Sequence, residues 1–283
     1  MNAVTPEQYQ ERLLELFAKA DEVQAILDDP QRERFAVKPG TALFGDDQGS
    51  MPYYVSHDVN RLLGVGFQHV HALGCLIRSG ALHPSAPFTL ARAAIETGAM
   101  AYWVLSPAAR RDRILRRLQL ARKDIMDGDS AATGAGIPVN RPRDERLTEL
   151  EDLSERVCGT RTVPGLNPSA IIEQVESQLQ PEQQMHQLLA WKVCSGFTHG
   201  RLWPETSLLK QEIIQTDGDV VRLRLTNDLS RVLWVTTAGW RVLNAALRGL
   251  LFTHPRLAVR CTGSSSAGTA GGAPTHRRRA LPC

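Results

Sequence analysis

SAPFTLARAAIETGAMAYWVL, residues 85–105, is a predominantly apolar stretch that opens with serine and proline at the positions typical of a helix start. Its apolar side chains continue around the whole helix, which is typical of a buried core helix. The small residues Ala91, Ala94, Gly98 and Ala101 recur along it and allow another helix to approach closely. This stretch therefore predicts the central helix of an α-helical bundle.

Helix signals dominate on both sides of this stretch. Thr5-Pro6-Glu7-Gln8 combines a capping threonine, a proline at the first helical position and a glutamine three residues after the cap. Helical periodicity and start signals predict further helices at about 6–29, 58–79, 107–127, 143–157, 168–179, 181–203 and 229–253, the last of them capped by Asn227 or Asp228. Residues 30–56 and 129–143 lack this periodicity and are predicted as a long loop and a Gly/Ala/Pro-rich linker.

One passage has the pattern of a β-hairpin. Two β-rich runs, 212–216 and 220–225, flank Asp217-Gly218-Asp219, which is a strong short-range hairpin signal. An isolated hairpin is marginal in water, so we expect it to pack on the helices or to pair elsewhere. The predicted fold class is mainly α, a helical bundle with one small β-hairpin at about 212–225 and a disordered C-terminal tail.

Composition divides the chain into an N-terminal helix with its loop (1–56), a helical bundle domain (57–255) and a basic tail (256–283). The tail holds five arginines and no acid among Gly, Ser and Ala residues, a composition that cannot build a core. Without those five arginines the formal net charge falls from +3 to −2. The positive net charge comes from the tail and is thus no indication that the predicted bundle attracts nucleic acid.

The sequence predicts a cytoplasmic protein with no membrane partner. Five cysteines without a Cys-x-x-Cys motif indicate reduced thiols. The N-terminus has no basic and apolar run of the kind found in signal peptides. The most apolar window, 233–252, carries Arg241, Asn244 and Arg248, which argues for a core helix and against a membrane span.

The candidate site centres on residues 191–203. Lys192, Ser195 and His199 are spaced i, i+3 and i+7, so a helix places them on one stripe. One interpretation is catalytic, with His199 as general acid/base and Lys192 stabilising anionic charge. The other is structural, with His199 and Ser195 satisfied by buried hydrogen bonds and Lys192 reaching solvent.

Arg92 and Glu96 form an i, i+4 pair inside the apolar helix 88–105. A charge pair there is expected to be partly buried and to need partners from another helix. His199 is the candidate partner, since a carboxylate would orient its ring. The alternative is a purely structural ion pair that fixes the helix register. The catalytic candidates are thus His199, Lys192 and Glu96, with Arg92 and Ser195 as binding residues.

Other motifs give weaker signals. The arginine-rich helix that follows Pro107 could face phosphate, or it could pair with the acids of residues 144–155. His71 and Cys75, at i, i+4, are the only pair with the spacing of metal ligands, and core or surface roles suit them better. Phosphate-binding, dinucleotide-binding, zinc-protease and nucleophile-elbow motifs are absent from the sequence. We therefore predict no metal and no cofactor.

Two motifs together resemble bacterial all-helical families: Arg-x-x-x-Glu at Arg92 and Glu96, and Ser-x-x-x-His-Gly at Ser195, His199 and Gly200. These families are distantly similar to the HEPN superfamily of helical bundles, which includes metal-independent ribonucleases of toxin and defence systems. The resemblance implies His199 as general acid/base at a homodimer interface and RNA as substrate. In this chain Lys192 stands where that superfamily has arginine, and lysine contacts phosphate only as a point charge.

Three functions follow from these observations. The first, which we favour, is a non-enzymatic interaction or structural module in which Arg92, Glu96, Ser195 and His199 form a buried polar cluster. The second is a HEPN-like ribonuclease. The third is a protein that binds a small ligand in the same place. The sequence identifies no specific partner; a second copy of the chain and RNA are the candidates.

Overall fold

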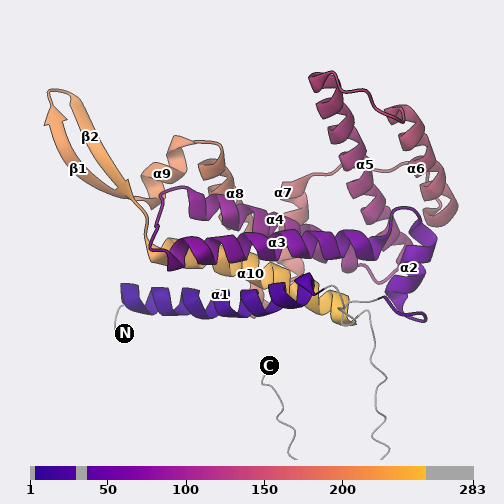
Figure 1. Cartoon of the computed structure of the whole chain (residues 1–283), viewed down its shortest axis with the longest axis horizontal. Coiled ribbons are helices and arrows are strands. Elements are labelled where there is room, and N and C mark those ends of the chain that lie inside the picture. The colour runs from indigo at the N-terminus through magenta and orange to yellow at the C-terminus, as the bar shows by residue number, and fades with distance from the viewer. Residues whose placement is uncertain (1–3, 30–36, 253–283) are drawn as a thin grey trace, which may run out of the picture.

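The computed structural model describes residues 4–29 and 37–252, and the predicted tail at 256–283 lies outside them. The described chain is a helical bundle with one antiparallel two-stranded hairpin, which confirms the predicted fold class for these residues (Figure 1). Its elements are α1 (Pro6–Asp28), α2 (Ala42–Ser50), α3 (Val55–Arg78), α4 (Ala86–Leu105), α5 (Arg110–Ala135), α6 (Arg143–Cys158), α7 (Pro168–Gln178), the 3-10 helix η2 (Pro181–Gln183), α8 (Gln187–Thr198), α9 (Leu202–Leu208), β1 (Lys210–Asp217), β2 (Val220–Thr226) and α10 (Leu229–Phe252).

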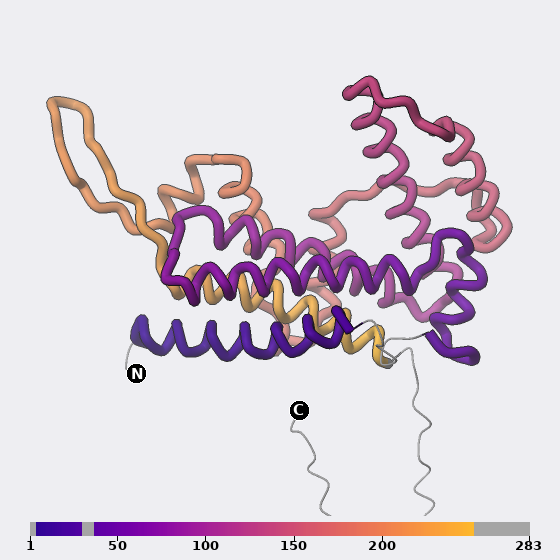
Figure 2. The backbone as a smooth tube through the Cα atoms, viewed as in Figure 1, coloured from indigo at the N-terminus to yellow at the C-terminus, as the bar shows by residue number. Residues whose placement is uncertain are grey.

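The helix predicted from residues 85–105 is α4, and it lies at the centre of the bundle. Helices α3, α7, α8 and α10 pack around it, and α1 covers α3 and α10 (Figures 1 and 2). A Cβ added at Gly98 would lie 3.1 Å from the backbone nitrogen of Leu243 in α10, and one added at Gly66 of α3 would lie 2.4 Å from the Leu243 side chain. These glycines therefore permit the close approach of α3, α4 and α10.

The start of α1 matches its sequence signal. The Thr5 side chain accepts a hydrogen bond from the Gln8 backbone, and the Gln8 side chain accepts one from the Thr5 backbone. This capping box satisfies two donors that the first helical turn leaves free. The helix then buries Leu13, Phe17 and Ala20 against the bundle.

The prediction of a continuous loop over residues 30–56 is wrong, because α2 forms within it. Thr41 caps α2 by accepting from the Phe44 backbone at 3.2 Å. The glycines that made this segment look like a loop have a packing role. A Cβ at Gly45 would lie 2.1 Å from the Arg110 guanidinium, and one at Gly49 would lie 3.0 Å from the Ile114 side chain. Tertiary contact with α5 thus outweighs the low helix propensity of glycine.

The basic helix α5 is longer than predicted. It continues through residues 129–135, which the sequence analysis placed in a linker, and ends where Gly136 adopts a φ of 67°. Ala131, Ala132 and Ala135 favour continuation of the helix. A left-handed glycine then ends it in the usual way.

The single helix predicted over 181–203 is divided into η2, α8 and α9. His186 has a φ of 54° before α8, and Gly200 has a φ of 60° after it, so the chain changes direction at both positions. After Gly200 the chain folds back and packs α9 on α8. A Cβ at Gly196 would meet Pro204 at 2.9 Å and the Trp203 ring at 3.3 Å, which explains the need for glycine there.

Helix α10 begins at Leu229, and Asp228 is its cap. The Asp228 side chain accepts from the Ser230 backbone at 2.8 Å. Asn227 has another role, because its side chain donates to the carbonyls of His83 and Pro84, just before α4. None of the helices in the described residues is long and apolar enough to pass through a membrane.

The predicted hairpin is formed by β1 and β2, which extend away from the helices (Figure 1). Ile214 lies at a break in register between the Ile213–Leu223 and Gln215–Arg222 pairs. Within the described residues, the two strands make a sheet of their own. Every strand residue except Leu225 is exposed, so the expected packing of the hairpin on the helices is limited to its foot.

Candidate functional site

The predicted charge pair in α4 forms, and its partner is an indole. The Arg92 guanidinium lies 2.9 Å from Glu96 Oε2, with side chains 27% and 23% exposed. Trp191 of α8 donates its indole N–H to the same Glu96 oxygen at 2.9 Å. The Arg92 guanidinium also lies 5.5 Å from the centre of the Trp191 ring. The three side chains form a closed cluster that joins α4 to α8.

His199 lies away from this cluster. The Phe88 and Phe197 rings stack at 4.0 Å, and the Thr89 and Thr198 hydroxyls lie 3.4 Å apart. Together with the hydrogen bond from Trp191 to Glu96, these contacts show that α4 and α8 run antiparallel. Glu96 is seven residues beyond Thr89, which separates it from the His199 end of α8 by about 10 Å along the helix axis.

The residues of the predicted stripe differ in their environments. His199 ends α8 and is exposed, Lys192 is exposed, and Ser195 is half-buried. No hydrogen bond or ion pair joins these three side chains to Arg92 or Glu96 in the described part of the chain. The expectation that His199 contacts Glu96 is therefore wrong. Sequence patterns cannot reveal this separation of His199 from Glu96, because the Phe88–Phe197 stack sets the register of α4 against α8.

The interior beside the cluster is apolar. Cys194 of α8 is buried, and this burial raises the pKa of its thiol well above the ordinary value. A buried neutral thiol behaves as a small hydrophobic side chain. The Arg92 Nε atom is also buried and has no hydrogen-bond partner in the described residues. These features suit a structural joint better than an acid/base centre.

A second, more deeply buried polar centre joins α2 to α5, and no sequence pattern beyond the charges themselves points to it. Arg113 donates to both carboxylate oxygens of Asp46, at 2.6 and 2.8 Å. Its remaining nitrogen donates to the carbonyls of Pro107 and Ala108. Asp46 is fully buried and Arg113 nearly so. The bidentate geometry and the two carbonyls satisfy the guanidinium.

The arginines of α5 have partners other than those considered from the sequence. Arg117 lies 3.6 Å from the buried Asp58 of α3, and Arg116 donates to the Trp103 carbonyl. The acids of residues 144–155 pair instead with Arg141, Arg143 and Arg161. Arg113 and Arg117 thus have their partners in the protein interior, and Arg116 is half-buried.

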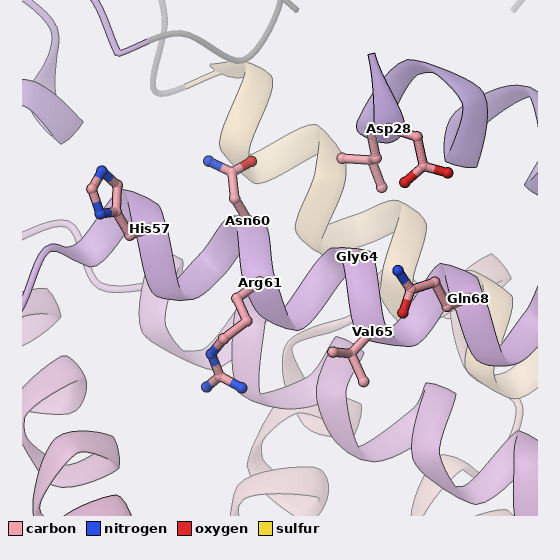
Figure 3. Close-up of a pocket in the computed structure, with 8 residues that line it drawn as sticks. Asp28, His57, Asn60, Arg61, Gly64, Val65 and Gln68 are labelled. Carbon is pink, nitrogen blue, oxygen red and sulfur yellow. The ribbon is translucent and has the colours of Figure 1, made fainter. Parts of the chain in front are cut away.

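Two grooves flank α1. One, of about 420 Å³, lies between the end of α1 and α3. Figure 3 shows Asn60, Gly64 and Gln68 along one side of α3 with Asp28 opposite. The other, of about 580 Å³, lies between α1 and α10 and includes both Trp234 and Trp240. Neither groove includes a residue of the predicted site.

The hairpin presents an exposed apolar surface to which the sequence motifs assign no role. Strand register places Ile213, Leu223, Val221 and Leu225 on one face of the ribbon. The exposed fractions of Ile213, Val221 and Leu223 are 66%, 48% and 43%. Leu202 and Trp203 of α9, the helix that precedes β1, are also exposed. The opposite face carries the Glu212–Arg224 ion pair and Arg222, together with the exposed Val220.

Comparison with known proteins adds no relative: no family model, curated protein or solved structure matches this chain. The HEPN-like resemblance therefore stays a prediction. In the described residues, no three His, Cys, Asp or Glu side chains are placed as ligands of one metal ion.

Proposed function

We propose that this protein is a non-enzymatic interaction module that associates with a second copy of itself through the apolar face of its hairpin. The observation that carries the proposal is that this face is uncovered by the described chain. A two-stranded ribbon is marginal on its own, and contiguous exposed apolar surface marks interaction sites. A second copy packed against Ile213, Val221 and Leu223 would remove these side chains from water.

The strands place no charged residue on the apolar face, which suits a second copy as the occupant. Arg222 and Arg224 lie on the opposite face, where they contact Gln215 and Glu212. The tip carries Asp217 and Asp219, and no ion pair to either is found in the described residues. Two ribbons packed antiparallel about a two-fold axis through their apolar faces would keep the acidic tips at opposite ends of the interface. A parallel arrangement would bring the acids together.

The interface needs more than the ribbon alone. A stable interface buries about 800 Å² on each partner, which exceeds what one face of a short two-stranded ribbon provides. Leu202 and Trp203 of α9, the helix just before β1, are exposed and would supply further apolar surface. An aromatic anchor such as Trp203 is the residue type that contributes most to association.

The test is the oligomeric state of the full chain, measured by sedimentation equilibrium. We expect the wild type to dimerise and the Ile213→Asp/Leu223→Asp double variant to be monomeric, because two charges would be buried in the interface. Replacement of Gln215 by Ser on the opposite face is the matched control and should leave the dimer intact. A monomeric wild type would contradict the proposal. So would RNA degradation that His199→Ala abolishes, which would favour the ribonuclease.

A further inference from the structure

Four polar side chains of α1 and α3 meet on the surface of the bundle, away from the hairpin and from the Arg92 cluster. His71 Nδ1 lies 2.7 Å from Asp21 Oδ1, and His71 Nε2 lies 3.5 Å from the Cys75 sulfur. Arg78 completes the group, with its guanidinium 3.2 Å from Asp21 Oδ2 and 3.8 Å from the Cys75 sulfur. The contacts therefore run from the Asp21 carboxylate through the His71 imidazole to the Cys75 thiol.

Elementary hydrogen-bond chemistry fixes the direction of this chain of contacts. An ionised carboxylate can only accept, so the Nδ1 atom of His71 carries the proton that is donated to Asp21. In the neutral ring the Nε2 atom is then the acceptor, and it faces the thiol. His71 is thus oriented to take a proton from Cys75. A thiol, a base in hydrogen-bond reach and a third group that orients the base are the parts of an activated nucleophile.

The surroundings of Cys75 differ from those of the other described cysteines. Cys75 is exposed, Cys158 is half-buried and Cys194 is buried. Burial raises the pKa of the thiols of Cys158 and Cys194. Among these three described cysteines, only Cys75 combines access from solvent with a facing imidazole and a nearby guanidinium, the kind of microenvironment in which reactive cysteines occur.

The same geometry argues against the metal pair considered from the sequence. A metal shared by His71 and Cys75 would need the Nε2 lone pair and the sulfur to point at a common ion. Here Nε2 points at the sulfur itself, and Nδ1 is occupied by Asp21.

We propose that Cys75 is a nucleophilic thiol that exchanges with disulfides, with His71 as its general base and Asp21 as the residue that positions His71. The Nε2 atom takes the thiol proton while the sulfur attacks one sulfur of the disulfide. The disulfide S–S bond breaks and a mixed disulfide forms at Cys75. The leaving thiolate takes the proton from the imidazolium and departs as a thiol, so Cys75 is oxidised and the leaving sulfur is reduced. Excess thiol reverses the step.

The test follows the reaction of the full chain with oxidised glutathione at about pH 7 and locates the modified cysteines by peptide mass spectrometry. We expect Cys75 to be modified faster than Cys158 or Cys194. His71→Asn should slow Cys75 about tenfold, because the amide can still donate to Asp21 but cannot accept the thiol proton. Asp21→Asn should slow it by a smaller factor, because the ring loses only its orientation.

Two controls separate this role from a structural one. His69 lies on the same helix, and its ring contacts the Val65 carbonyl. The control variant His69→Asn should therefore leave the rate at Cys75 unchanged. At about pH 10 the rates of the wild type and His71→Asn should converge, because accessible thiols ionise without a base. Equal rates for the two proteins at about pH 7, a difference that persists at high pH, or no modification of Cys75 would overturn the proposal.

Discussion

Two ion pairs of this protein differ in their exposure, and the difference decides what each contributes. The Asp46 carboxylate is fully enclosed with Arg113, whereas Arg92 and Glu96 are each about a quarter exposed. Removing one partner of an enclosed pair leaves a charge in a medium that cannot solvate it. Water can replace part of the interaction at the Arg92 pair.

At the residue scale, we predict that Asp46→Asn lowers the free energy of unfolding by about 3 kcal/mol, because Arg113 stays buried without its counter-charge. Glu96→Gln should lower it by only about 1 kcal/mol, since the amide oxygen still accepts from Trp191. Urea denaturation of both variants measures the two losses. A larger loss for Glu96→Gln than for Asp46→Asn would contradict this ranking.

The sequence predicted part of the polar chemistry and missed the rest for a physical reason. An Arg92–Glu96 pair that needs a partner from another helix follows from the cost of burying charge, and the pair is found. The identity of that partner depends on how α8 is rotated and shifted against α4, which the Phe88–Phe197 stack fixes. Asp46 and Arg113 are 67 positions apart, and no local pattern connects them.

At the scale of elements, most helices were predictable because their caps and apolar stripes are local. At α2 the prediction failed because contacts made by distant residues override local preference. Gly45 and Gly49 lower the helix propensity of α2, yet they admit Arg110 and Ile114 of α5. Conversely, an uninterrupted helical pattern at 181–203 gives no sign that the chain bends at Gly200.

The cap of α10 gives a prediction with a pH dependence. The hydroxyl and backbone N–H of Ser230, with Lys210, lower the pKa of Asp228 to about 2 against the opposing effect of burial. Because the pKa is lower in the folded state, the stabilisation is complete above about pH 4 and is lost as the pH falls towards 2. Asp228→Ala should therefore cost about 1 kcal/mol at neutral pH, after allowance for solvent screening.

Thermal or urea denaturation from about pH 7 down to about pH 2 measures this dependence. The difference between wild type and Asp228→Ala should shrink as Asp228 becomes protonated. A constant difference across this range would show that the charge of Asp228 has no part in its capping role.

At the scale of the whole molecule, the hairpin is separable from the bundle. Its strands pair in a sheet only with each other within the described chain. Polar contacts with the body lie at its foot, where Lys210 pairs with Asp228 at 3.0 Å and the Gln211 side chain donates to the Thr206 carbonyl. A variant that joins Lys210 to Leu225 through a short Gly/Ser linker keeps that foot and loses the ribbon.

We predict that this variant keeps the unfolding free energy of the wild-type monomer to within about 0.5 kcal/mol. Its urea midpoint should not depend on protein concentration. The wild-type midpoint should rise when the protein concentration is raised by about a hundredfold, because association stabilises the folded dimer. A variant that no longer unfolds cooperatively would show that the ribbon is part of the folding unit.

The position of α10 has a consequence for how the protein is made. The central helix α4 leaves the ribosome early, but the helix that covers it, α10, is encoded more than a hundred residues later. Until residue 252 has cleared the exit tunnel, Gly98 and its neighbours have no Leu243 against which to pack. We therefore expect nascent chains to hold this apolar surface open for most of translation and to depend on chaperones during that interval.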